Sequence, residues 1–326
     1  MTRNETTYRQ KLDTAVNLLN TLPLHKLDSD PDLLDAAFTV AYDEALFNLH
    51  EYVPELQNPL KFELFSALCP LSGSLAFLAV QILAANRIMQ GNGFAKADEY
   101  YKMRCGIAIN HLRAPVTVVD SVKSKTGYKL TGRLTWASGY RIFDTLVVGF
   151  HHDGQEMQAV MPFVPQNGCT IGEPDETFVG LSMNTVNIDL EGYEIPEENV
   201  ICSHPIGHYT RQKSVSKTVH MALYGIGLGA VMALEDDEVI ADAARRLDAL
   251  KEAFMGTDDG KRMDGLRIEL FNLVQQIVTT GIVLYGGKSI LDEKALQRYY
   301  RELIMFNSNG LNDTIKGLFK KSFLQP

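Results

Sequence analysis

Apolar residues recur at helical spacing from Tyr8 to about Tyr101, which predicts a lobe of amphipathic helices at the start of the chain. Within this lobe the segment 75–89, LAFLAVQILAANRIM, is apolar almost all round. Ser72, Gly73 and Ser74 precede it and have the turn and capping character of a helix start. We therefore expect 75–89 to be the buried central helix of an N-terminal α-helical domain at 1–102.

From about Cys105 the pattern changes to short β-branched runs separated by turn residues. Turn signals occur at 125–127 (KTG), 153–154 (DG) and 166–168 (QNG). The runs between them predict strands at Val116–Val119, Tyr128–Leu134, Thr145–Phe150, Gln158–Val164 and Thr185–Leu190. A middle β domain at 103–204 follows from this pattern.

Helical spacing returns after Pro205. The segment Thr218–Leu234 is rich in Gly and Ala, which permits close approach of a neighbouring backbone. Further helices are predicted at Glu238–Phe254, at about Arg262–Tyr285 and at about Asp292–Asn307. They form a C-terminal α-helical bundle domain at 205–326. The order all-α, all-β, all-α predicts an α+β fold and argues against the alternating βαβ pattern of a Rossmann domain.

The net charge and the positions of the cysteines exclude some classes of function. Lys and Arg number 31 against 40 Asp and Glu, and the resulting charge of −9 argues against a nucleic-acid partner. The four cysteines are far apart, with no paired CxxC and no adjacent histidine cluster, so we expect no metal site and reduced core thiols in a cytoplasmic protein. The N-terminus is polar, and no stretch reaches the roughly 18 uncharged apolar residues of a membrane span.

Three segments resemble the acyl-CoA dehydrogenase family, in the order that the family has them. The segment 127–147, GYKLTGRLTWASGYRIFDTLV, is similar to the family's G-Y-x-L-x-G-x-K-x-W-I-T-N-G-x-x-A-D strand pair. The segment 181–200, LSMNTVNIDLEGYEIPEENV, resembles the G-M-x-x-T-x-x-x-x-F-x-x-V-x-V-P-x-E-N-x-L exit from the β domain. The segment 284–301, LYGGKSILDEKALQRYYR, is similar to G-G-x-G-Y-x-x-x-x-x-x-x-R-x-x-R-D, through Gly286, Gly287, Arg298 and Arg301. The chain resembles a divergent, shortened member.

The resemblance implies FAD as cofactor, an acyl thioester as substrate, and hydride transfer from substrate to flavin. Trp136, Ala137 and Ser138 match the W-I-T step and would wall the flavin ring, although a Trp that only packs in the sheet is the alternative. Asn110 stands where a flavin-bonding Thr is usual, in the segment CGIAINHL, and a surface turn explains it equally well. Gly286 and Gly287 match a turn that approaches the dinucleotide half of the flavin, but a helix C-cap accounts for the same pair.

The family's catalytic carboxylate is missing from both of its usual positions. Where most members have a Y-E-G-T turn, this chain reads IMFNSNG, with Asn309 before the glycine, and an amide cannot accept the α-proton. On the Gly- and Ala-rich helix, where a minority of members place the Glu, the titratable group is His220. His220 is therefore a candidate base, with a hydrogen-bonded core histidine as the alternative.

Three functions remain open. The first is a dehydrogenase-like oxidoreductase acting on a CoA- or carrier-bound acyl group, in fatty acid metabolism. The second is a flavin monooxygenase on the same scaffold, which needs no base at the α-carbon. The third is a scaffold without redox activity that binds an acyl chain or a partner, which the absence of the family's G-S-D and R-x-Q-F-G elements favours. The Gly- and Ala-rich helix and the apolar C-terminal helices predict a homo-oligomer, a dimer or a tetramer.

Overall fold

The computed structural model describes residues 4–113, 116–211, 216–311 and 313–324. By contacts along the backbone the chain divides into two compact units. The helical unit comprises Met1–Phe77, Phe178–Gly180 and Lys213–Pro326, and the sheet unit comprises Leu78–Thr177 and Leu181–Gln212. The predicted α+β fold class, with helical parts on either side of a central sheet in sequence, is confirmed.

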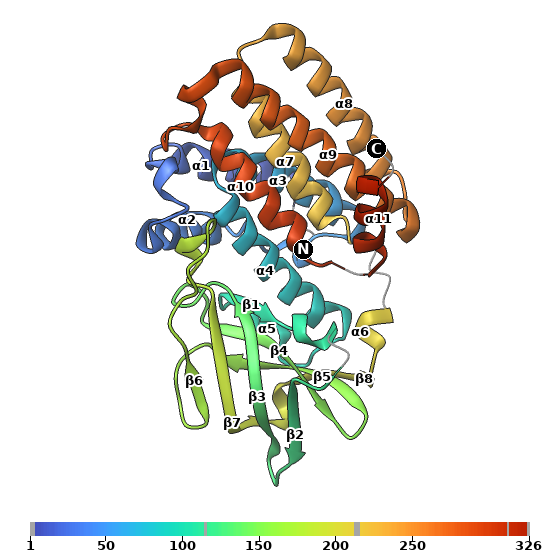
Figure 1. Cartoon of the computed structure of the whole chain (residues 1–326). Coiled ribbons are helices and arrows are strands. Elements are labelled where there is room, and N and C mark those ends of the chain that lie inside the picture. The colour runs from blue at the N-terminus through green and yellow to red at the C-terminus, as the bar shows by residue number, and fades with distance from the viewer. Residues whose placement is uncertain (1–3, 114–115, 212–215, 312, 325–326) are drawn as a thin grey trace. The chain divides into compact units, whose positions relative to one another are not determined.

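In the helical unit, segments from both ends of the chain pack into one bundle (Figure 1). Side-chain oxygens of Asn4, Asp30, Asp236 and Asp259 accept hydrogen bonds from backbone N–H groups in the first turn of the helices that they precede. The helices are α1 (Glu5–Leu19), η1 (Leu24–Lys26), α2 (Pro31–Asp43), η2 (Leu49–Glu51), α3 (Pro54–Leu71), α4 (Gly73–Gly91, shared with the sheet unit), α7 (Thr218–Met232), α8 (Asp237–Met255), α9 (Gly260–Tyr285), η6 (Gly286–Ile290), α10 (Ala295–Ser308) and α11 (Asp313–Leu324).

Helix α7 is the centre of this bundle and packs against α3, α8, α9 and α10. Its glycines make the close packing possible. A Cβ atom on Gly225 would lie 2.4 Å from the carbonyl oxygen of Phe65 in α3, and one on Gly229 would lie 2.7 Å from the ring of Tyr299 in α10. The predicted close approach of backbones at this helix is therefore confirmed.

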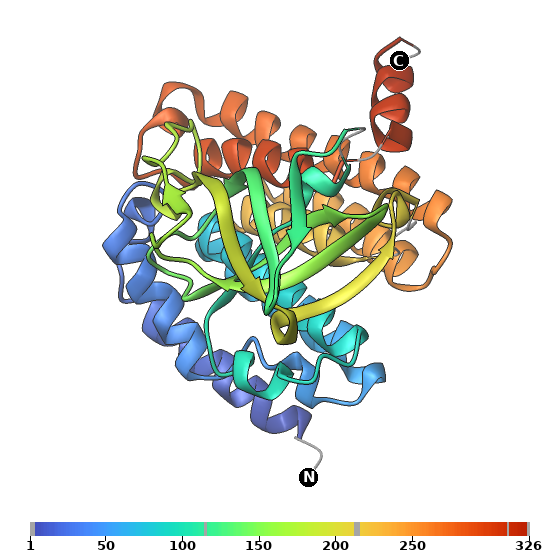
Figure 2. The same cartoon turned by 90° about the horizontal axis from the view of Figure 1, so that it is seen from below.

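The sheet unit holds an eight-stranded sheet (Figures 1 and 2). The strand order is β6-β7-β3-β2-β4-β5-β8, and β1 also pairs with β4. β1 and β2 run parallel to β4, and the other pairs are antiparallel. The elements are α5 (Ala97–Tyr100), β1 (Cys105–Ala108), η3 (Asn110–Arg113), β2 (Val119–Lys123), β3 (Gly127–Ala137), β4 (Thr145–His152), β5 (Gln155–Pro162), β6 (Cys169–Ile171), η4 (Leu181–Met183), β7 (Val186–Pro196), η5 (Glu197–Asn199), β8 (Val200–Pro205) and α6 (His208–Arg211).

Most predicted elements are present, with one strand displaced. The expected central helix 75–89 lies within α4, and Leu75, Ala79 and Ala85 are fully buried. The expected strand Val116–Val119 is wrong in position, because β2 begins only at Val119 and ends at Lys123. Its pairing with β3 fixes these limits, since Val119 lies opposite Gly132 and Lys123 opposite Tyr128. Val116 is exposed outside the ladder.

One helical stretch of the described chain is long and apolar enough to cross a membrane by length and composition, Gly260–Ile290. A core helix of a globular bundle has the same properties, and Leu266, Leu270, Val274 and Ile277 of α9 are buried in the helical unit.

All four cysteines are free; Cys69, Cys105 and Cys169 are buried, and Cys202 is partly buried. Burial raises the pKa of each thiol.

Candidate functional site

Trp136 has an unusual conformation at the end of β3. Its backbone φ is +60°, in the left-handed region that non-glycine residues rarely adopt. The register with β7 shifts between Leu134 and Ala137, so Trp136 lies in an irregular part of the ladder. Such an irregularity redirects a side chain, and the indole is 61% exposed. The sheet therefore holds its only tryptophan outward at a conformational cost.

The two residues that follow Trp136, Ala137 and Ser138, are buried. Ala137 pairs with Val186 of β7 and is fully buried. The Ser138 hydroxyl lies 2.9 Å from the Thr185 hydroxyl, and both side chains are buried. The candidate segment 136–138 is thus joined to Thr185, which was not among the predicted site residues. The signal for Thr185 was its match to the T of the G-M-x-x-T pattern.

Asn110 also belongs to the sheet unit but lies on another element. It begins η3 after β1, is exposed, and follows a strand that pairs with β4. The neighbouring His111 Nε2 is 2.8 Å from the carbonyl oxygen of Gly149 in β4. Burial lowers the pKa of His111, so the neutral imidazole donates this hydrogen bond and fixes the turn that carries Asn110.

Gly286 and Gly287 follow α9 in the helical unit. Gly286 has φ +62° and its N–H donates to the carbonyl of Ile282, so Gly286 does form the C-cap. Apart from their chain neighbours, no atom of the described chain lies within 4 Å of a Cβ placed on either residue. The positive φ accounts for glycine at Gly286, whereas packing within the chain does not account for glycine at Gly287, and the open space lets another molecule approach this backbone closely.

His220 lies inside the helical unit on α7, where its side chain is 95% buried. Its Nε2 is 2.8 Å from the carbonyl oxygen of Met263, and a carbonyl can only accept, so Nε2 carries the proton. Burial lowers the pKa of His220 to about 4, and the imidazole is neutral at pH 7. Within the described part of the chain Nδ1 has no hydrogen-bond partner and retains a free lone pair.

Asn309 caps the C-terminal end of α10, where Arg267 of α9 holds the backbone. One guanidinium nitrogen of Arg267, Nη2, donates to the carbonyl oxygens of Asn307 and Asn309, each at 2.6 Å. Arg267 is itself buried. Because these carbonyls have no partner within a helix, the buried cation satisfies them and fixes the turn that carries Asn309.

A buried carboxylate, Glu302 of α10, lies seven residues before Asn309 and was not predicted. Its Oε1 accepts a hydrogen bond from the Gly73 N–H at 2.7 Å and is 3.6 Å from Arg298 Nη1. Its Oε2 is buried and has no partner in the described residues. Burial raises the pKa of Glu302 to about 7, although the positive charge of Arg298 opposes this shift.

A second buried carboxylate, Asp28, extends this polar cluster. Its oxygens accept from the Ser74 hydroxyl at 3.0 Å and from the Gly180 N–H at 2.6 Å. Arg301 donates to Asp28 at 2.8 Å and to the carbonyl of Phe178 at 3.1 Å. The sequence signal for Glu302 was its place directly after Arg298 and Arg301, which reads as R-x-x-R-E.

Comparison with solved structures places the chain among proteins of one fold. It is similar to glutaryl-coenzyme A dehydrogenase in its glutaryl-CoA complex, with a TM-score of 0.79 and 13% identity over 98% of this chain and 94% of that one. It is also similar to KijD3 in complex with FMN and a dTDP-linked amino-keto sugar (TM-score 0.77, 17% identity, 99% and 95% covered). The HsaA monooxygenase from M. tuberculosis matches with a TM-score of 0.74 and 14% identity over 99% and 98%.

These likenesses define the class: the chain has the acyl-CoA dehydrogenase fold, and the predicted resemblance is confirmed at the level of fold. No family model matches the sequence, and no curated protein matches it.

Proposed function

We propose that the chain is a flavin-dependent oxidoreductase with FAD as cofactor, acting in the cytoplasm on an acyl thioester carried by CoA or by a carrier protein. The fold supports a flavin enzyme by analogy, and Trp136 is the observation that carries the proposal. An exposed indole held at φ +60° is a cost to the free protein. A flat aromatic ligand that stacks on the indole offsets that cost.

The residues around Trp136 fit a flavin ring. The indole supplies an exposed apolar wall, and the contact between the buried Ser138 and Thr185 hydroxyls anchors the backbone that follows it. A bound flavin supplies the hydride-accepting chemistry. The task of Trp136 and its neighbours is to orient the ring. Gly286 and Gly287, whose backbone has open space beside it, are a separate candidate contact for the dinucleotide half of a flavin.

The visible spectrum of the purified protein, before and after incubation with FAD or FMN, tests this proposal. We expect an absorbance band near the usual flavin region that remains after gel filtration, and chromatography of the released cofactor identifies FAD or FMN. A protein that stays colourless after incubation with both would reject the redox proposal and favour a scaffold that binds an acyl chain or a partner.

A flavin monooxygenase is the second candidate. It is favoured by Asn309, an amide at the family's usual base position, and by His220, whose pKa burial lowers to about 4, which makes the imidazole a weak base. A protein of this fold named as a monooxygenase is among the similar structures. Anaerobic mixing separates the two functions: a dehydrogenase bleaches its flavin when the acyl thioester is added, whereas a monooxygenase does so only with an external reductant.

The proposal includes a homo-oligomer, a dimer or a tetramer. Large apolar side chains are exposed at the C-terminal ends of α7, α9 and η6, namely Met232, Val283, Leu284, Ile290 and Leu291. Burying them against a second copy would remove apolar surface from water. Sedimentation velocity at micromolar concentration should show a dimer or tetramer. Monomer alone at that concentration contradicts this part of the proposal.

A further inference from the structure

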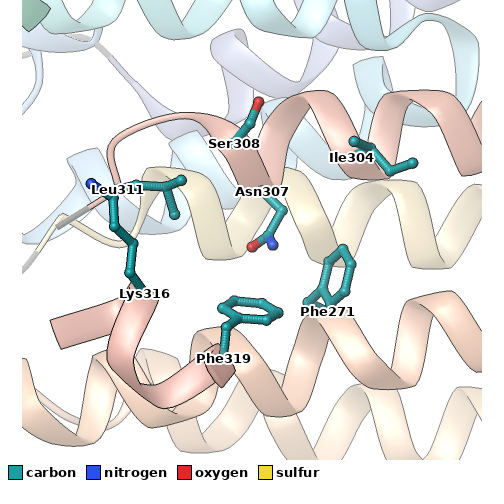
Figure 3. A pocket seen from close by; sticks show the side chains of 7 residues that line it. All are labelled: Phe271, Ile304, Asn307, Ser308, Leu311, Lys316 and Phe319. Carbon is teal, nitrogen blue, oxygen red and sulfur yellow. The ribbon is translucent and has the colours of Figure 1, made fainter. Parts of the chain in front are cut away.

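A groove of about 360 Å³ lies within the helical unit between α9, α10 and α11 (Figure 3). It contains none of the residues assigned above to the flavin or to the base. The rings of Phe271 and Phe319 meet edge to face at 5.3 Å and form one apolar side. The lining consists of Phe271, Ile304, Asn307, Ser308, Leu311, Lys316 and Phe319.

Two polar side chains of this groove, Asn307 and Lys316, have N–H groups that can donate hydrogen bonds to a ligand. Asn307 Oδ1 is turned toward Arg267 Nε at 3.4 Å, which leaves its amide nitrogen for the groove, and Figure 3 shows the side chain pointing toward the two phenyl rings. Lys316 rises from α11 along another side, and its contact with Asp313 is long, at 3.7 Å. The Ser308 hydroxyl is already bonded to the Met305 carbonyl. The described lining residues include no carboxylate, so the groove suits an anionic acceptor.

Helix α11 is weakly attached to the bundle. Ile315 is its one buried residue within the described chain, and the Phe271–Phe319 contact joins it to α9. A ligand in the groove would touch both α11 and α10, and would therefore add to the contacts that hold α11 in place.

We infer that this groove binds a small carboxylate with an aromatic body, with the acid group at Lys316 and Asn307 and the ring against Phe271 and Phe319. The volume sets the size, because ligand pockets usually span about 300–1,000 Å³ and this one is near the lower limit. It accommodates a single ring with a short chain. In a chain of net charge −9, the cationic edge at Lys316 supplies the local attraction.

Calorimetric titration with 3-phenylpropionate tests this inference, with 3-phenylpropan-1-ol as the neutral probe of the same shape. We expect the acid to bind and the alcohol to bind at least about fivefold more weakly, the factor that corresponds to roughly 1 kcal/mol. Lys316→Gln should weaken acid binding by a similar factor. Lys320→Gln, on the same helix but outside the lining, is the matched control and should leave the affinity within about twofold.

Hydrogen exchange adds a readout at the helix itself, since the acid should slow amide exchange in 313–324. Absence of binding at millimolar acid, equal binding of acid and alcohol, or equal weakening by Lys316→Gln and Lys320→Gln would each overturn the inference. The assay needs no flavin and no turnover, so its outcome is independent of the proposed redox function.

Discussion

At the scale of single residues, Trp136 gives the sharpest test of the flavin site. Trp136→Ala should lower flavin occupancy clearly while changing the melting temperature little, because the exposed indole has few contacts to lose. Occupancy is read from the ratio of visible to ultraviolet absorbance, and stability from thermal unfolding of the flavin-free forms. Trp136→Phe keeps an aromatic face and serves as the control. An alanine variant that keeps full flavin but loses its fold would make Trp136 a packing residue.

Glu302 predicts a pH dependence of stability with a definite sign. Its pKa is raised from 4.5 to about 7 in the folded state, so the folded protein binds more protons than the unfolded chain between these values. The contribution of Glu302 is therefore fully present below pH 4.5 and is lost as pH rises toward 7. The loss is on the order of 3 kcal/mol, from 1.36 kcal/mol per pKa unit.

Urea unfolding at pH 5 and at pH 7.5, for the native chain and for Glu302→Gln, measures this loss. The glutamine keeps an acceptor for the Gly73 N–H but cannot titrate. We expect the native chain to lose more stability than the variant on going to pH 7.5, because all other titrating groups are common to both. Equal pH dependence in the two proteins would show that Glu302 does not titrate in this range.

At the scale of elements, Arg267 is the residue that joins α9 to the end of α10. Arg267→Met preserves length and apolar volume but leaves the carbonyls of Asn307 and Asn309 without their buried donor. We expect a loss of at least about 2 kcal/mol in the free energy of unfolding. Arg246→Met, at an exposed arginine of α8, should change it by about 0.5 kcal/mol or less. Similar effects of the two substitutions would contradict the role assigned to Arg267.

Comparison of the predicted with the observed helices and strands shows which parts of the fold the sequence predicts. The helix α4 was predictable because residues apolar all round a helical turn have no stable place outside a core. The strand near Val116 was misplaced because β-branched residues indicate a strand but not its register, which β3 decides.

The sequence predicted some residues of the candidate site and missed others. Trp136 and Ser138 were found because they stand in one short motif. Thr185 pairs with Ser138 across 47 residues, which no local pattern reveals. Glu302 resembled a residue of a charged helix face, but a Cβ on Gly73 would lie 2.4 Å from its side chain, so its burial depends on a glycine far away in sequence.

At the scale of the whole molecule, the fold does not guarantee the reaction of any one relative. Abstraction of an α-proton needs a positioned general base, which is typically worth about 10²–10⁴-fold in rate. Asn309 cannot serve, and the low pKa of His220 makes the imidazole a weak base. We therefore expect straight-chain acyl-CoA thioesters to be dehydrogenated very slowly or not at all, even by protein whose flavin occupancy is complete.

The assay uses acyl-CoAs of several lengths with an artificial electron acceptor, on protein whose flavin occupancy has been measured. His220→Ala should abolish any residual turnover if His220 Nδ1 accepts the proton, and a flavin spectrum unchanged by the substitution shows that the cofactor is retained. Asn309→Glu should raise turnover, because it places a carboxylate on the turn that Arg267 holds. Turnover in the ordinary enzyme range of about 1–10³ s⁻¹ that survives His220→Ala would place the base elsewhere in the chain and would make both assignments wrong.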